Sequence, residues 1–259
     1  MKIGLAQTNI CWESKGSNLK RADGFIKQAA NEGCDCIIFP EMFATGFSMD
    51  TTLTGESRNG ETCKYLSDAS KRHRTAILAG YALRKGEREE MYNCAAAFDS
   101  RGELTGEYAK IHLFSPGHED SYYTPGKSPA VFDFAGVRAS MFICYDLRFP
   151  EIFRKVASEV RIIFVIANWP SRRQDHWNIL LKARAIENQC YIAGVNRSGK
   201  DGNSILYTGG SAVYGPAGKT VYLAGSSEEL GIAEIAPERV DRIRNKFPVL
   251  KDMKKEMLI

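Results

Sequence analysis

Apolar residues near the start of the chain form two short runs separated by a segment of helical spacing. The run from Lys2 to Gln7 predicts a buried strand. Ser17 then resembles the N-cap of a helix in which apolar residues recur every three or four positions, and Gly33 ends that helix. A second apolar run, from Cys34 to Phe39, predicts the next strand and stops just before Glu41. Strand, helix and strand in this order predict a sheet covered by helices.

The same alternation continues toward the C-terminus. Helices are predicted over residues 61–73, 151–158 and 175–188, and strands over residues 76–81, 91–98, 104–108, 131–134, 137–143, 161–166, 191–196, 211–214, 220–224 and 232–235. Pro237 opens a last short helix. The polar loop from His112 to Pro129 is long enough to suggest a function. No repeat or linker divides the chain, so we expect a single domain over residues 1–259.

Composition narrows the class of protein. With 44% hydrophobic and 25% charged residues, the chain has enough apolar side chains for a sizeable core. The 35 basic residues barely exceed the 31 acidic ones and form no long basic block, so nucleic-acid binding is not supported. No window is long enough for a signal segment or a membrane span, so we expect a cytoplasmic protein without membrane contact. Seven cysteines without paired spacing predict reduced thiols.

Three reactive side chains lie at equivalent places in the predicted sheets. Glu41, Lys110 and Cys144 each fall within two residues of the carboxyl end of a predicted strand, where ligands of α/β sheets gather. Cys144 occupies a strand-to-helix turn, which presents a thiol outward and lets a following backbone N–H bind an oxyanion. The alternative for Cys144 is an inert buried thiol.

A nucleophilic thiol needs a base or a nearby cation. None of the four histidines lies in a recognisable Cys/His signature, so a carboxylate base is the alternative. Glu41 has apolar neighbours on both sides in the sequence, which predicts a pKa raised toward neutrality and suits a general base and acid. Lys110 supplies the cation. Taken alone, Glu41 is equally compatible with a loop-end side chain that faces water, and Lys110 fits an ordinary surface lysine better.

Three motifs carry a family resemblance. Phe-Pro-Glu-Met-Phe around Glu41, Tyr-Ala-Lys-Ile-His-Leu-Phe around Lys110 and Ile-Cys-Tyr-Asp-Leu-Arg-Phe-Pro-Glu around Cys144 resemble the nitrilase superfamily of carbon-nitrogen hydrolases. The similarity covers nearly the whole chain and is closest to the bacterial omega-amidase branch. It implies Cys144 as nucleophile, Glu41 as general base and then acid, Lys110 as oxyanion stabiliser and Glu119 as a second glutamate.

The resemblance also implies an architecture and partners. The expected fold is α/β, a four-layer α-β-β-α sandwich that assembles into a homodimer or a higher homo-oligomer. Neither a metal nor an organic cofactor is expected. The residues agree, because there is no His-Glu-x-x-His segment, and Cys34 and Cys36 alternate with Asp35 inside a predicted strand without zinc-ligand spacing.

The implied substrates are small-molecule amides, namely dicarboxylic monoamides such as 2-oxoglutaramate and 2-oxosuccinamate, hydrolysed to the acid and ammonia through a cysteine thioester. Their free carboxylate needs a cation, and Arg172 and Arg173 are candidates because they follow a predicted strand end. Ordinary surface charge is the alternative for both. The other residues expected around the substrate are Phe47, Phe114 and Trp169, with the backbone N–H of Tyr145. Arg184 lies within a predicted helix, where we expect it to be a structural partner of Glu187 or a backbone carbonyl.

Two other functions fit the same residues. An N-carbamoyl amine or amino acid amidohydrolase, or a nitrilase, uses the same Glu-Lys-Cys site with a different pocket, and ammonia release from 2-oxoglutaramate separates these activities. A non-catalytic interaction protein on the same fold has no need to keep nucleophile, base and cation together. Thiol alkylation coupled to loss of activity tests that alternative.

Overall fold

Two six-stranded sheets form the centre of the computed structural model, which describes residues 1–254. The first sheet has the order β14-β1-β2-β3-β4-β5. Its strands are β1 (Lys2–Gln7), β2 (Cys36–Ile38), β3 (Ala76–Lys85), β4 (Glu90–Phe98), β5 (Leu104–Ala109) and β14 (Glu229–Glu234). The second sheet has the order β13-β12-β9-β8-β7-β6. Its strands are β6 (Val131–Phe134), β7 (Val137–Ile143), β8 (Ile162–Ala167), β9 (Tyr191–Asn196), β12 (Ala212–Tyr214) and β13 (Thr220–Leu223).

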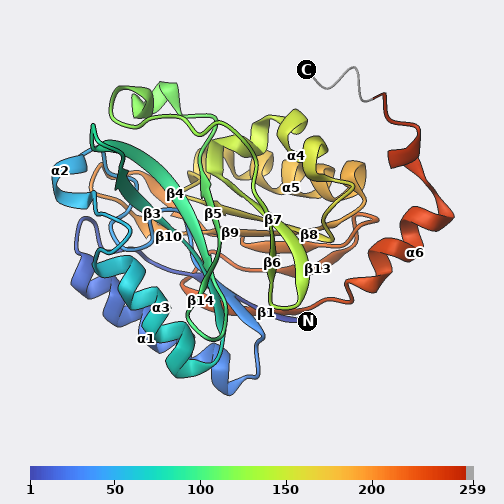
Figure 1. Ribbon diagram of the computed structural model, residues 1–259, viewed down its shortest axis with the longest axis horizontal. Helices are drawn as coiled ribbons and strands as arrows, with labels where there is room; N and C mark the ends of the chain where they lie inside the picture. Colours follow the sequence, from blue (N-terminus) through green and yellow to red (C-terminus); the bar gives the residue numbers. More distant parts are fainter. Residues whose placement is uncertain (255–259) are drawn as a thin grey trace.

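Helices cover the outer face of each sheet. The first sheet is covered by α1 (Lys15–Asn31) and α3 (Glu61–His73), and the second by α4 (Pro150–Val156) and α5 (Gln174–Asn188). Figure 1 shows these two helix pairs on opposite sides of the stacked sheets. The predicted four-layer α-β-β-α sandwich is therefore confirmed. The remaining α-helices of residues 1–254 are the short α2 (Thr51–Thr54) and α6 (Glu238–Lys246).

Strand residues divide between two apolar layers. In β2, Cys36 and Ile38 face the core between the sheets, whereas Ile37 packs with the residues of α1 and α3. A strand in the first sheet is thus buried on both faces, which explains why its sequence is apolar without alternation. On the second sheet, Trp177 and Leu181 of α5 pack against the outer face at Gly194 of β9, and they belong to the same cluster of buried residues. The core holds the strand ends in place, and the site lies at those ends.

Most predicted elements agree with the structure, and α3, β6, β7 and β9 have the predicted bounds. The N-cap prediction was wrong, because α1 begins at Lys15 after Ser14 and includes Ser17. The strand prediction from Cys34 was too long. β2 begins at Cys36, and the Asp35 carboxylate instead accepts the backbone N–H of Lys2 at 2.7 Å.

The parallel strands bring their carboxyl ends to shared edges. β1, β2 and β3 pair in parallel, and so do β7, β8 and β9. β4 is antiparallel to both β3 and β5, so the beginning of β4 lies at the edge where β3 and β5 end. A small two-stranded ribbon that was not predicted, β10 (Ser198–Lys200) with β11 (Leu206–Thr208), lies beside this edge. Among the helices of residues 1–254, none is long and apolar enough to cross a membrane.

Candidate active site

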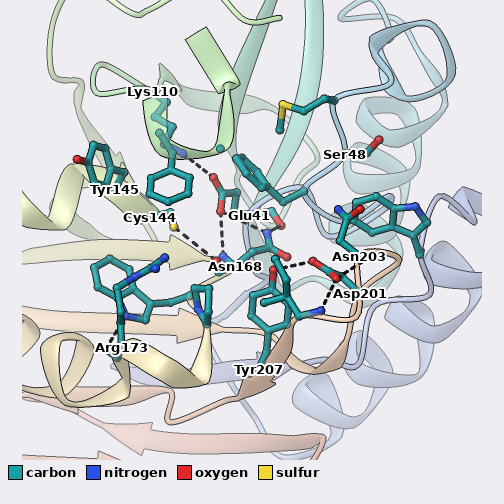
Figure 2. A pocket seen from close by; sticks show the side chains of 18 of the residues that line it. Glu41, Ser48, Lys110, Cys144, Tyr145, Asn168, Arg173, Asp201, Asn203 and Tyr207 are labelled. Carbon is teal, nitrogen blue, oxygen red and sulfur yellow. Dashed lines mark hydrogen bonds and ion pairs between the residues drawn. The ribbon is translucent and has the colours of Figure 1, made fainter. Parts of the chain in front are cut away.

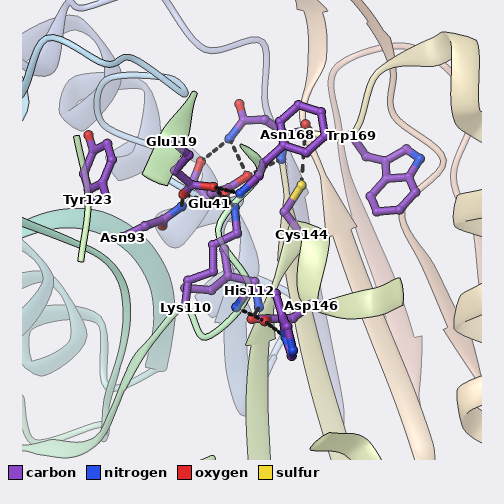
Figure 3. A network of polar contacts seen from close by, with 12 residues as sticks. Glu41, Asn93, Lys110, His112, Glu119, Tyr123, Cys144, Asp146, Asn168 and Trp169 are labelled. Atoms are coloured by element: carbon purple, nitrogen blue, oxygen red, sulfur yellow. Dashed lines mark hydrogen bonds and ion pairs between the residues drawn. The ribbon is translucent and has the colours of Figure 1, made fainter. Parts of the chain in front are cut away.

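The structure brings the four predicted catalytic residues together. Lys110 Nζ donates to Glu41 Oε1 and to Glu119 Oε2, each at 2.9 Å, and all three side chains are fully buried. The half-buried Cys144 lies beside them, with Sγ 3.7 Å from the carbonyl oxygen of Asn168. Figure 3 shows this cluster, in which the residues come from segments far apart in the chain.

The loop that carries Glu41 needs a glycine on the neighbouring strand. Glu41 follows β2, and the next residue, Met42, has a left-handed φ of 44°. A Cβ at Gly80 of β3 would lie 2.7 Å from the Cα of Glu41, a distance that side chains do not tolerate. Gly80 therefore permits the close approach that places the Glu41 carboxylate beside Lys110.

Cys144 lies at the start of a strained turn. It follows β7 and has a φ of 46°, which is unusual for a residue with a side chain. The strain is offset by the carboxylate of Asp146, which accepts the backbone N–H of Ile143 at 3.1 Å. Strained backbone of this kind gathers at functional sites because the surrounding structure has to hold it. The turn presents the Cys144 thiol toward the cavity, as predicted.

Asp146 also ties the Cys144 turn to the segment around Lys110. Its buried carboxylate accepts hydrogen bonds from the Tyr108 hydroxyl at 2.7 Å and from the His112 backbone N–H at 2.9 Å, and it lies 2.9 Å from His112 Nδ1. Tyr108 and His112 flank Lys110 on both sides. Sequence reasoning missed this role of Asp146, although its position two residues after Cys144 was an available signal.

Two asparagines complete the cluster, and sequence reasoning missed both. Asn168 follows β8 and donates its backbone N–H to Glu41 Oε2 at 2.9 Å and its side-chain amide to the Glu41 carbonyl at 2.7 Å. Asn93 lies in β4 and donates to both glutamates. The available signal for Asn93 was a polar residue within an otherwise apolar strand.

The pKa expected for Glu41 was wrong in direction. Burial raises this pKa, but the charge of Lys110 and the hydrogen bonds from Lys110, Asn93 and Asn168 outweigh burial and lower it below its ordinary value of 4.5. The apolar neighbours of Glu41 in the sequence are not the groups that its carboxylate meets in space. For Glu119, burial and the negative charge of Glu41 prevail over Lys110 and raise the pKa.

The thiol and the ammonium also have shifted pKa values. Burial and the negative charge of Glu41 raise the pKa of the Cys144 thiol well above its ordinary value, and the positive charge of Lys110 only partly opposes them. Burial acts to lower the pKa of Lys110, but the charges of Glu119 and Glu41 raise it, so Lys110 stays protonated. The resting site therefore holds a neutral thiol beside an ionised Glu41.

A cavity of about 420 Å³ opens onto Glu41, Lys110 and Cys144. Figure 2 shows this pocket, with Cys144, Tyr145 and Arg173 toward one end, Ser48 and Asn203 toward the other, and Glu41 between them. The structure places all six residues expected around the substrate in its wall: Phe47, Phe114, Tyr145, Trp169, Arg172 and Arg173. The wall also contains Arg148, a further cation close to Cys144 in the sequence, and residues that sequence reasoning missed: Trp12, Ser48, Asp201, Asn203 and Tyr207.

Three arginines line one part of the cavity. Arg173 is half-buried with its guanidinium 5.4 Å from the centre of the Phe114 ring, and Arg148 lies 4.8 Å from the Trp169 ring. Arg172 is exposed. Within residues 1–254, none of the three has a carboxylate at ion-pair distance. Burial, and then the charges of Arg172 and Arg148, lower the pKa of Arg173.

Arg184, by contrast, has a structural role, as predicted. It is buried in α5 and lies away from the cavity. Its guanidinium donates to Glu187 Oε1 at 3.0 Å and to the carbonyl oxygen of Leu147 at 2.8 Å. The first contact is an ion pair one turn along the same helix, and the second fastens α5 to the turn that follows Cys144.

Solved structures of similar shape define the class of fold. The structure matches a CN-hydrolase superfamily protein from Xanthomonas campestris, which has an arsenic adduct in its active site, with a TM-score of 0.92 and 31% identity over 98% of this chain and 97% of that one. It also matches Nit3 of Saccharomyces cerevisiae, a member of branch 10 of the nitrilase superfamily, with a TM-score of 0.87 and 26% identity over 96% and 94% of the two chains. The fold is that of the nitrilase superfamily.

Sequence relatives identify the family. The chain is 33% identical to a 2-oxoglutaramate amidase of Bacillus subtilis (strain 168), over 98% of each protein. It is 32% identical to an omega-amidase of Escherichia coli (strain K12), over 97% of this chain and 96% of that protein. Residues 2–245 match the model of the carbon-nitrogen hydrolase family. The chain belongs to this family, and the resemblance inferred from its motifs is confirmed.

Proposed function

We propose that this protein is an omega-amidase, which hydrolyses the omega-amide of small dicarboxylic monoamides such as 2-oxoglutaramate and 2-oxosuccinamate to the acid and ammonia. The observation that carries the proposal is the arrangement of the cavity. A thiol, an ionised carboxylate and an ammonium lie beside three guanidinium groups that have no carboxylate partner in the described residues. The names of the two relatives described above support the same substrate class.

Catalysis begins with proton transfer between Cys144 and Glu41. Because the thiol is neutral at rest, Glu41 accepts its proton as the sulfur adds to the amide carbon. The carbonyl electron pair moves onto oxygen, and this oxyanion is held by Lys110 and by the backbone N–H of Tyr145. The Lys110 ammonium carries three hydrogens. One goes to Glu41, a second is shared by the two Glu119 oxygens at 2.9 and 3.2 Å, and the third is available for the oxyanion.

The tetrahedral intermediate then collapses to a thioester. Glu41 gives the proton it received to the amide nitrogen, the carbon–nitrogen bond breaks and ammonia leaves. Water attacks the thioester with Glu41 again accepting a proton, which releases the carboxylic acid and restores the thiol. Glu119 is fully buried behind Lys110, and this supports a role in holding the ammonium rather than in contacting the water.

The arginines select the substrate. Arg173 has two cationic neighbours, Arg148 and Arg172, and a free carboxylate of the substrate bound against it supplies the missing negative charge. The planar guanidinium suits two-point binding of that carboxylate. Arg173 is a better candidate than Arg172 because it is half-buried and stacks on Phe114 within the cavity. Trp169 and Phe47 supply the apolar wall along the carbon chain of the substrate.

An ammonia-release assay over a panel of compounds tests the function. We expect release from 2-oxoglutaramate and 2-oxosuccinamate, and much slower release from N-carbamoyl amines, nitriles and amides without a carboxylate. Mass spectrometry of the wild type during turnover should detect an acyl adduct on Cys144, and the variant Cys144→Ala should carry none. Faster turnover of N-carbamoyl amines, or an adduct at another residue, would overturn the proposal.

We also propose that the protein forms at least a homodimer through α5. Ile179 and Ile186 lie two turns apart on the same face of this helix, with 65% and 49% of their surfaces exposed. Large exposed apolar residues in such a row are typical of an interface. Light scattering coupled to size-exclusion chromatography should give at least twice the mass of the chain, and Ile179→Glu should lower it. A monomeric wild type contradicts the proposal.

A further inference from the structure

Asn93 contacts both glutamates of the candidate active site. Because β4 runs antiparallel to its neighbours, Asn93 near its start lies at the edge where β5 delivers Lys110. Its Nδ2 donates to Glu41 Oε1 and to Glu119 Oε1, each at 2.7 Å, and the side chain is fully buried (Figure 3). Its Oδ1 has no hydrogen-bond partner in the described residues. One amide group thus has both hydrogens committed to the site.

Chemistry decides the orientation of this amide. The two oxygens that Asn93 faces are also bonded to the Lys110 ammonium. An ionised carboxylate only accepts hydrogen bonds, so a flipped amide would set its oxygen against two negative groups. Turning the NH₂ group toward the glutamates leaves Oδ1 buried without a hydrogen-bond partner in the described residues, which is unfavourable by itself.

The backbone of Asn93 holds the third member of the cluster. The Asn93 carbonyl accepts the backbone N–H of Lys110 at 2.9 Å. In the first sheet, the next pair in the ladder joins Cys94 to Ala109, so the register of β4 and β5 sets this contact. Asn93 therefore contacts Lys110 through its backbone and both glutamates through its side chain, so one residue helps to position all three.

We propose that Asn93 is a positioning residue for the amidase reaction, a proposal that rests on the proposed function. It bridges Glu41 and Glu119 with two hydrogen bonds and adds no charge. An additional cation there would bind Glu41 more tightly and weaken it as a base, and an additional carboxylate would repel both glutamates. An apolar side chain would leave the two Oε1 atoms facing each other with only Lys110 between them. A neutral side chain with two hydrogens on one nitrogen meets all three conditions.

The test compares Asn93→Leu with a matched control, Asn188→Leu. Asn188 is also fully buried, its amide donates to the Arg184 carbonyl at 3.0 Å, and its Oδ1 is likewise unpartnered, but it lies outside the cavity wall. We expect Asn93→Leu to lower kcat for 2-oxoglutaramate about 100-fold, with KM changed less than about threefold, because a displaced catalytic group affects the reaction more than substrate binding. Asn188→Leu should keep kcat within about threefold while losing comparable thermal stability.

A second variant gives a pH signature that a purely structural role would not produce. In Asn93→Asp, the new carboxyl group faces two others, so its pKa is raised and it stays protonated to higher pH than an ordinary aspartate. The protonated form donates one hydrogen bond and restores part of the bridge, whereas the ionised form repels both glutamates. The ratio of variant to wild-type kcat should therefore rise as the pH falls. Should Asn93→Leu not fold, the test rests on this pH dependence and on the ratio of variant to wild-type kcat measured for Asn93→Ser.

Alkylation of Cys144 separates this proposal from the proposed function. Iodoacetamide needs no substrate pocket, but it reacts with the thiolate, whose formation depends on a correctly placed Glu41. Mass spectrometry should show slower labelling of Cys144 in Asn93→Leu than in Asn188→Leu, even if the wild type hydrolyses no amide of the panel. The proposal fails if Asn93→Leu keeps kcat within about threefold and labels as fast as the control, or if the Asn93→Asp ratio does not change with pH.

Discussion

Replacing Arg173 by methionine tests how the cavity recognises a carboxylate. Methionine keeps an apolar stem against Phe114 and removes the charge. A charge-assisted hydrogen bond contributes about 1.5–3 kcal/mol. Because Arg148 and Arg172 remain nearby to take up part of the interaction, we expect a loss of about 2 kcal/mol in transition-state binding. At 1.36 kcal/mol for each factor of ten, kcat/KM for 2-oxoglutaramate should fall about 30-fold.

The comparison substrate and the control variant make this prediction specific. An uncharged amide such as butyramide has no carboxylate, so its kcat/KM should change less than about twofold in Arg173→Met. Arg172→Met removes an exposed guanidinium from the same wall, and we expect less than about a threefold loss with either amide. Initial rates of ammonia release give all the constants. An equal loss for both amides, or a larger loss in Arg172→Met than in Arg173→Met, would refute this account of recognition.

Further predictions concern the pH dependence, the oxyanion and the core. Because the pKa of Glu41 lies below 4.5, its ionised form persists through neutral pH and is lost only as the pH falls through that lowered pKa. The acid limb of the pH profile of kcat/KM should therefore lie below pH 4.5. A reversible acid limb centred above about pH 6 contradicts this. Lys110→Met removes an oxyanion donor and should lower kcat about 100-fold or more in ammonia-release assays. A variant above a tenth of wild-type kcat excludes that role. Trp177→Ala empties a fully buried position between α5 and the second sheet and should reduce the free energy of unfolding by about 3–5 kcal/mol in urea titrations. A loss below about 1 kcal/mol would mean that the core closes over the gap.

Much of the fold was predictable because secondary structure follows local patterns. The spacing of apolar residues predicted α3, β6, β7 and β9 with their bounds. The errors in strand length arose where pairing partners decide how far a strand extends. β3 extends to Lys85 because Lys85 pairs with Glu90 of β4, and that pairing is not visible in the sequence of β3 alone.

The candidate site was only partly predictable, for a similar reason. Glu41, Lys110 and Cys144 were visible as reactive residues at predicted strand ends and through their motifs. The charge state of Glu41 was not, because its pKa depends on Lys110, Asn93 and Asn168, which lie 52 or more residues away along the chain. The same holds for Asp146, whose neighbours at Tyr108 and His112 become neighbours only when β5 and β7 are brought together.

The sequence by itself therefore determined most of the helices and strands, the family and the identity of the reactive groups, since each depends on short stretches of chain. Tertiary structure alone decided which donors surround each carboxylate, which arginines of residues 1–254 lack a carboxylate partner and how the Cys144 turn is held. Hydrogen bonds and charges act over a few ångströms in space. Folding joins segments that are distant in the chain, so the electrostatics of the site become defined only once both sheets are packed.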